Sequence, residues 1–248
     1  MKHMTKAEIE KLDKETSANM PCRYKQDETE TISPNNSFRD VKRRGIKAVW
    51  IDFGGEIQRY LRCLKRFSDL EAVLLHCCYG GPGGMEQYGG LKELPNLRCV
   101  NIVDSAQLNG AVLRTIAELP KLEMLTLKSQ NIDLVADLQA LAKAESLRAI
   151  KIDDLRCWKD ETRTASDEPW VEDVRFLSEM PNLENLDVGG CKHLDLSKFV
   201  LPPRLKVITV PNYTDAATIR RFKEQCAVQI GIRIYPPRKN RFVRESWR

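Results

Sequence analysis

Long hydrophobic runs are absent from this 248-residue chain, and no apolar segment approaches the roughly 20 residues that a helix needs to cross a bilayer. The N-terminal stretch MKHMTKAEIEKLDKETSANM is polar and lacks the apolar core of a cleavable secretion signal. These two absences predict a cytoplasmic protein without a transmembrane segment, with export by a route that leaves no cleavable signal as the alternative.

Residues suited to catalysis are also scarce. The chain has three histidines, of which His3 lies in the polar N-terminal stretch. No motif sets a nucleophile beside a histidine base. The glycine-rich segment HCCYGGPGGMEQYGG lacks the Gly-Lys-Ser/Thr of a phosphate-binding loop. These absences predict a protein that is not an enzyme and needs no cofactor.

The net charge of +5 is concentrated at the two ends of the chain. Residues 1–44 carry ten basic and eight acidic side chains, and residues 235–248 carry five basic and one acidic. The 25 basic and 26 acidic side chains of residues 45–234 nearly cancel. A body so close to neutral argues against a broad phosphate-binding face on the folded part.

A short pattern, apolar-x-x-apolar-x-apolar, recurs eight times in residues 46–232. Successive copies start 24, 27, 25, 25, 36, 22 and 22 residues apart. The alternation inside each copy points the apolar side chains to one face of a strand. A single strand cannot bury that face alone, so stacked copies are expected to form a parallel sheet over a shared core. The copies are Ile46/Val49/Ile51, Leu70/Val73/Leu75, Leu97/Val100/Ile102, Leu122/Leu125/Leu127, Leu147/Ile150/Ile152, Leu183/Leu186/Val188, Leu205/Ile208/Val210 and Ala227/Ile230/Ile232.

The turn before the strand repeats as well. The segments LKELPNLRCVNI, IAELPKLEMLTL and LSEMPNLENLDV align, with Pro95, Pro120 and Pro181 in equivalent positions. This repeat resembles the leucine-rich-repeat superfamily. The resemblance implies an α/β fold: a right-handed solenoid, or horseshoe, with about eight parallel strands on its concave face and helices or irregular turns on its convex face. We expect the helices within residues 57–67, 110–119, 134–144 and 214–226, the last capped by Thr214 or Asp215.

The repeat divides the chain into three parts. Residues 45–234 form the solenoid, residues 1–44 are a polar arm or a cap over the first repeat, and residues 235–248 are a basic tail. Two insertions break the period, and the second, within residues 153–175, carries Trp158 and Trp170. Because insertions in repeat proteins often lie on the binding side, both tryptophans are candidate contacts for a partner.

Leucine-rich repeats usually have an asparagine or cysteine after the strand, where it hydrogen-bonds to neighbouring turns. Most repeats of this chain have a different residue there. The slot three residues after the last strand apolar holds Gly54, Cys78, Ser105, Gln130, Leu155, Cys191 and Tyr213. Cys78 and Cys191 fit the family pattern, but four repeats separate them. That distance is too great for a shared zinc ion, so we expect the eight cysteines to be reduced and mostly buried.

The strand positions that alternate with the core are expected to line the concave face. The central positions are Trp50, Leu74, Asn101, Thr126, Lys151, Asp187 and Thr209, and the flanking positions are Asp52, His76, Val103, Lys128 and Asp153. Such a mixture of apolar, polar and charged groups with one tryptophan suits a protein partner. The alternatives are a solvated face without a ligand and a Trp50 covered by the N-terminal arm.

The basic tail interleaves cations with aromatic rings. Basic residues bind phosphates and aromatic rings stack on bases, so a nucleic-acid contact is an alternative to a merely solubilising tail or to an anionic membrane surface. The candidate residues are Arg238, Lys239, Arg241, Arg244 and Trp247. The sequence therefore predicts a protein-interaction module, and the alternatives are a nucleic-acid-associated protein and a structural subunit of a larger complex.

Overall fold

The computed structural model describes most of the predicted solenoid. The described residues are 29–32, 45–52, 57–76, 86–103, 108, 110–128, 131–154, 156–158, 174–225 and 229–233. For Asp52 and Trp158 the backbone alone is described. Trp170, Cys78 and the basic tail lie outside these residues.

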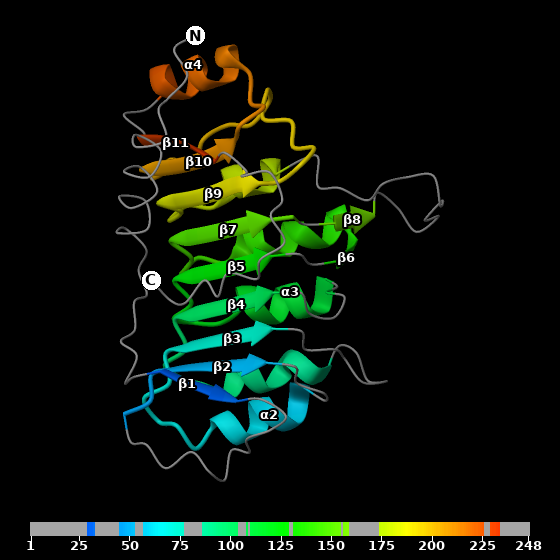
Figure 1. The fold of residues 1–248 in the computed structure, drawn as a ribbon, viewed down its shortest axis with the longest axis vertical. Helices are drawn as coiled ribbons and strands as arrows, with labels where there is room; N and C mark the ends of the chain where they lie inside the picture. Colours follow the sequence, from blue (N-terminus) through cyan, green and yellow to red (C-terminus); the bar gives the residue numbers. More distant parts are fainter. Residues whose placement is uncertain are drawn as a thin grey trace, which may run out of the picture.

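One parallel sheet organises the molecule (Figure 1). Its nine strands follow the order β1-β2-β3-β4-β5-β7-β9-β10-β11, so each strand lies beside the one before it in the repeat. The strands are β1 Thr29–Ile32, β2 Ala48–Asp52, β3 Ala72–His76, β4 Cys99–Val103, β5 Met124–Lys128, β7 Ala149–Asp153, β9 Asn185–Gly190, β10 Val207–Pro211 and β11 Gln229–Arg233. The predicted α/β solenoid is confirmed.

The register of the strands matches the predicted repeat residue by residue. The middle apolar residue of every copy pairs with its equivalent in the next, in the line Val49, Val73, Val100, Leu125, Ile150, Leu186, Ile208 and Ile230. The ninth strand, β1, pairs with β2 and comes from the segment predicted as an arm or cap. Its sequence, Thr-Glu-Thr-Ile, carries no copy of the repeat, so the pattern could not reveal it.

The returns between strands are short helices on one face of the sheet (Figure 1). They are the α-helices α2 Ile57–Leu64, α3 Gly110–Ala117 and α4 Ala216–Gln225 and the 3-10 helices η2 Glu86–Glu93, η3 Val135–Lys143 and η4 Arg175–Glu179. The helix expected over 134–144 is thus a 3-10 helix. Residues 191–206 contain no helix, which suits a shorter repeat that ends in Pro202 and Pro203.

Two further strands pair outside the main sheet. Strands β6 Asn131–Leu134 and β8 Arg156–Trp158 form a parallel two-stranded sheet. Strand β6 follows β5 and strand β8 follows β7. The two successive repeats therefore each add a short second strand after the main-sheet strand. Neither segment matches the strand pattern of the repeat, and neither strand was predicted.

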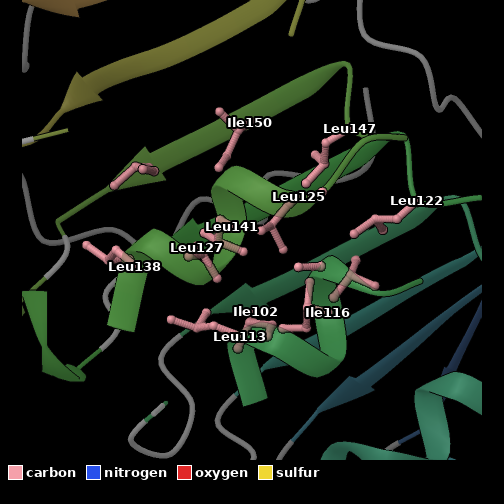
Figure 2. Packing of buried hydrophobic residues seen from close by; sticks show 14 of the residues in the cluster. Ile102, Leu113, Ile116, Leu122, Leu125, Leu127, Leu138, Leu141, Leu147 and Ile150 are labelled. Atoms are coloured by element: carbon pink, nitrogen blue, oxygen red, sulfur yellow. The ribbon is translucent and has the colours of Figure 1, made fainter. Parts of the chain in front are cut away.

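The core lies between the sheet and the helices. Figure 2 shows Leu125 and Leu127 of β5 packed with Leu113 and Ile116 of α3 and with Leu141 of η3. All five side chains are fully buried. The repeating apolar residues therefore form one continuous core in which each layer contacts the layers on both sides, as a stacked repeat requires.

Polar side chains link neighbouring turns ahead of the strands. Asn96 Nδ2 donates to the carbonyl oxygen of Ser68 at 3.0 Å, and Asn182 Nδ2 donates to that of Glu145 at 2.8 Å. Both asparagines follow the repeating proline. Side chains in this turn thus bond to the preceding repeat, and each such exposed bond adds a modest stabilisation.

Side chains at the position three residues after the last apolar strand residue also form hydrogen bonds between repeats. Cys191 Sγ donates to the carbonyl oxygen of Ile152 at 3.6 Å. Tyr213 Oη donates to the carbonyl oxygen of Cys191 at 2.9 Å and accepts the backbone N–H of Leu194 at 2.8 Å. Burial raises the pKa of Tyr213, so the hydroxyl stays a donor at neutral pH. A tyrosine therefore makes a link that the family pattern assigns to asparagine or cysteine.

Charges alternate in sign at the position just before seven neighbouring strands, from β2 to β10 in the main sheet. The residues of this charge ladder are Lys47, Glu71, Arg98, Glu123, Arg148, Glu184 and Lys206. Arg98 pairs with Glu71 at 3.3 Å and with Glu123 at 2.6 Å, and Arg148 pairs with Glu184 at 3.5 Å. The alternation favours the observed order of repeats, because a slipped pairing would bring like charges together.

Reversing the charge at Arg98 tests the ladder. Arg98→Glu places three carboxylates side by side, and we expect a loss of about 1 kcal/mol of unfolding free energy, since the side chains are partly exposed. The loss should shrink in 1 M NaCl because salt screens the repulsion. Urea unfolding at low and high salt measures it, with Lys121→Glu as control. Equal losses in both variants would show that the ladder contributes nothing specific.

Asp215 caps the last helix, as one of the two residues predicted for that role. Its carboxylate accepts the backbone N–H of Thr218 at 2.9 Å and the hydroxyl of Thr218 at 2.7 Å. These bonds favour the ionised form and lower the pKa of Asp215 below its ordinary value of 3.8, with the backbone bond as the largest cause. The cap thereby fixes the start of α4.

The cap predicts a pH-dependent loss of stability. A carboxyl with a lowered folded pKa stabilises the fold above its unfolded pKa, and that contribution disappears as the pH falls through the folded value. Asp215→Ala should therefore lower the urea midpoint at pH 7, and the gap from wild type should close below pH 3.8. Asp215→Asn, which keeps an acceptor, should lie between the two. A gap that persists at low pH would contradict the cap.

Candidate protein-binding face

The sheet face opposite the core, here called the concave face, carries one row of side chains across the sheet. The row is in register, and its members are Trp50, Leu74, Asn101, Thr126, Lys151, Asp187 and Thr209. A second row beside it contains His76, Val103, Lys128 and Asp153, with Asp52 as the register partner of His76. The strands thus bring the predicted residues into the predicted order.

Within both rows, the side chains differ in how much of their surface is exposed to solvent. Leu74, Asn101, Thr126, Asp153 and Asp187 are 9% exposed or less, so they shape the face more than they offer contacts. The partly exposed members are Trp50, His76, Val103, Lys128, Lys151 and Thr209. A partner that met the face as it stands would touch these six first.

Trp50 and His76 form an aromatic pair at the N-terminal end of the face. Their ring centroids lie 6.2 Å apart with the planes at 78°, an edge-to-face arrangement. The indole nitrogen of Trp50 is buried and meets no hydrogen-bond acceptor among the residues that the structure describes. Buried donors nearly always have a partner, so this indole N–H is unusual within the described part of the chain.

The middle of the face holds half-buried charges. Lys151 Nζ lies 3.9 Å from Asp187 Oδ2 on the neighbouring strand, with the two side chains 19% and 11% exposed. The other oxygen of Asp187 accepts the backbone N–H of Gly189 at 3.0 Å. A backbone bond within its own strand thus holds Asp187 in place. Lys151 lies 3.9 Å from that carboxylate and is the more exposed of the two, so its charge is the more accessible to a partner.

A β-bulge interrupts the face between β7 and β9. Pairing shifts after Lys151, so that Asp153 lies opposite Gly190. A Cβ atom on Gly190 would come 1.7 Å from Asp153 Oδ1, and glycine is therefore required there. Asp154 has a φ of 47°, and its carboxylate pairs with Lys192 at 2.6 Å. The 36-residue spacing predicted an insertion after β7, but the bulge itself was not predicted.

The insertion and tail candidates are not placed against this face. Trp158 belongs to β8 in the small sheet, with its side chain undescribed, and Trp170 lies outside the described residues. The tail residues Arg238, Lys239, Arg241, Arg244 and Trp247 lie outside them too. Their proposed contacts stay predictions.

The described residues contain neither a cluster of metal ligands nor a helix that could span a membrane. Within them, no three His, Cys, Asp or Glu side chains gather as ligands for a metal ion. No helix in the described ranges has the length and apolar character to cross a bilayer.

Comparisons with known proteins add little beyond the fold. No protein-family model matches the chain, and no curated protein matches it. A matching solved structure is an internalin from Listeria monocytogenes, 12% identical with a TM-score of 0.35. The match covers 68% of this chain and 62% of that one, so the chain spans less than two thirds of the internalin. The register of its own repeats shows that this chain has a leucine-rich-repeat-like α/β solenoid fold.

Proposed function

We propose that this chain is a non-catalytic protein-interaction module, acting as an adaptor, an effector or a regulatory subunit, that binds a protein partner on its concave face. The observation that carries the proposal is the unbroken row from Trp50 to Thr209, one side chain from each of seven neighbouring strands. With strands about 4.8 Å apart, the row spans roughly 29 Å. That span suits a macromolecule better than a small ligand.

The chemistry of the row supports a protein partner. The concave face is aromatic and aliphatic at its N-terminal end, and its middle carries Lys128 and Lys151 beside the buried carboxylates of Asp153 and Asp187. Specific protein interfaces likewise combine aromatic and aliphatic side chains with polar and charged ones. Trp50 is the natural anchor, because it is partly exposed and tryptophan is enriched among the residues that dominate binding energy.

Capture of the partner with matched baits tests the proposal. One variant carries Trp50→Ala, Lys128→Glu and Lys151→Ala on the concave face. A control carries Arg62→Glu and Lys143→Ala, exposed cations on the helical side, and has the same change in charge. Each bait is first checked for an unchanged thermal unfolding midpoint, and capture from the source lysate is repeated at low and high salt.

We expect a protein that wild type and control retain at high salt and that the concave variant loses. An apolar contact should resist salt, whereas a grip on phosphate should weaken steeply. A partner that all three baits retain equally would contradict binding on this face. If the baits recover only nucleic acid and high salt removes it, the result would support the alternative, in which the basic termini bind nucleic acid.

A further inference from the structure

The near-neutral charge of residues 45–234 conceals an uneven distribution. Residues 45–190 carry 17 basic and 23 acidic side chains, whereas residues 191–225 carry seven basic and three acidic. This basic segment comprises the loop after β9, strand β10 and helix α4, and all of it is described. One end of the solenoid is therefore positively charged in its folded part, independently of the tail.

Several cations of this segment are unpaired. Lys192 and Lys206 form ion pairs with Asp154 and Glu184 of earlier repeats. Four others, Lys198, Arg220, Arg221 and Lys223, have no carboxylate oxygen within 4.0 Å among the residues that the structure describes. We call these four the α4 cation cluster.

Packing holds the cluster together. Arg221 donates to the carbonyl oxygen of Leu196 at 2.7 Å, and its guanidinium lies 5.1 Å from the centre of the Phe222 ring. Phe222 in turn meets Phe199 edge to face at 6.2 Å. These contacts fix the loop that carries Lys198 against α4.

On α4 itself, Arg220 and Lys223 are exposed. They lie three residues apart, which places them on neighbouring turns of the same side of the helix. Two cations from α4 therefore face solvent together.

Three carboxylates in the same segment offset part of this charge. Asp215 bonds to Thr218 with both oxygens. Asp195 accepts the backbone N–H of Ser197 at 2.8 Å, and this bond, with a smaller contribution from the charge of Lys198, lowers its pKa. Glu224 is the one acidic residue within α4. With seven basic and three acidic side chains, residues 191–225 still keep a net charge of +4.

The chemistry of the cluster fits phosphate better than a membrane or an apolar protein surface. A membrane-bound helix needs a large apolar face beside its cations, and the exposed positions of α4 are Ala217, Arg220, Lys223, Glu224 and Gln225. Val200, 58% exposed, is a single aliphatic side chain beside the cluster. Arginine presents several planar donors that match phosphate oxygens, and rows of cations displace counterions from a phosphate backbone.

We propose that the α4 cation cluster binds the phosphate backbone of a nucleic acid, in addition to any contact made by the concave face. The contact is electrostatic and independent of base sequence. Each phosphate neutralised adds about 0.9 to the salt dependence of log Kd for duplex DNA and about 0.7 for a single strand.

Fluorescence anisotropy of the full chain with a 20-base-pair duplex and with a 20-nucleotide single strand tests this. Arg220→Ala with Lys223→Ala should lower the slope of log Kd against log salt by roughly 1.8 on the duplex. The control, Arg62→Ala with Lys143→Ala, removes two exposed cations elsewhere and should keep the wild-type slope. The tail is intact in every variant, so its contribution cancels.

Four results would overturn the proposal. One is the absence of binding by wild type at 50 mM salt, and another is an equal loss of slope in variant and control. A third is competition by polyglutamate as effective as that by unlabelled oligonucleotide, which would show attraction to any polyanion. A fourth is tighter binding to phosphatidylserine vesicles with the same variant defective, which would assign the cluster to a membrane.

Discussion

Replacing Gly190 with alanine is expected to destabilise the protein by about 3 kcal/mol, near the upper end of overpacking costs. The added Cβ would lie 1.7 Å from Asp153 Oδ1 and 2.1 Å from its Cγ. Asp153 is 6% exposed and lies in the next strand, so neither group can move aside without breaking the bulge. Urea unfolding followed by circular dichroism measures the loss.

Two further variants separate this clash from the general cost of losing a glycine. Gly89→Ala serves as control, because a Cβ there meets no atom within 4 Å, and its effect should stay within about 0.5 kcal/mol. Asp153→Ala combined with Gly190→Ala should be less destabilised than the two single effects predict together, since removing the carboxylate relieves the clash. A Gly190→Ala protein as stable as wild type would contradict the close packing of β7 against β9.

Replacing Leu127 with alanine should cost a similar amount, about 3 kcal/mol, for a different reason. The side chain is fully buried in the middle of the stack, where it packs with neighbours from β5, α3 and η3 (Figure 2). Truncation removes buried apolar surface and leaves a cavity. In a repeat array the cavity also weakens the interfaces with both adjacent repeats.

The control for Leu127 is a surface change of comparable size on the helical side. Arg114→Ala removes an exposed side chain of α3 and should shift the unfolding free energy by less than about 0.5 kcal/mol. Thermal and urea unfolding of both variants give the comparison. Equal stability of the two would show that position 127 lies outside the core, and the repeat register would then be wrong.

The fold was predictable because one residue pattern specifies both the strand and its register. A shift by one residue would turn Leu127 outward and Thr126 inward, so the alternation leaves a single arrangement. The three strands that the repeat pattern did not predict lack the alternation of apolar and polar residues. Strands β1, β6 and β8 are short and polar or irregular, and their pairing depends on neighbours that propensity does not reveal.

The candidate site was predicted in position but not in exposure. Alternation predicts Trp50, Asn101 and Asp187 on one face of the sheet, and the strand register aligns them in one row. Burial of Asn101 and Asp187 depends on what surrounds them, which a repeat pattern does not contain. The same holds for the charge ladder and for the α4 cation cluster, because both arise from residues brought together across repeats.

Site-specific photo-crosslinking tests the central claim, binding of a protein partner on the concave face, most directly. A photoreactive amino acid is placed at His76 or Lys128 on the concave face, and at Arg62 or Lys143 on the helical side. All four side chains are at least partly exposed. After irradiation with the captured partner, adducts should form from the two concave positions and be absent from the two helical ones. Adducts from the helical side alone, or equally from all four positions, would contradict the account.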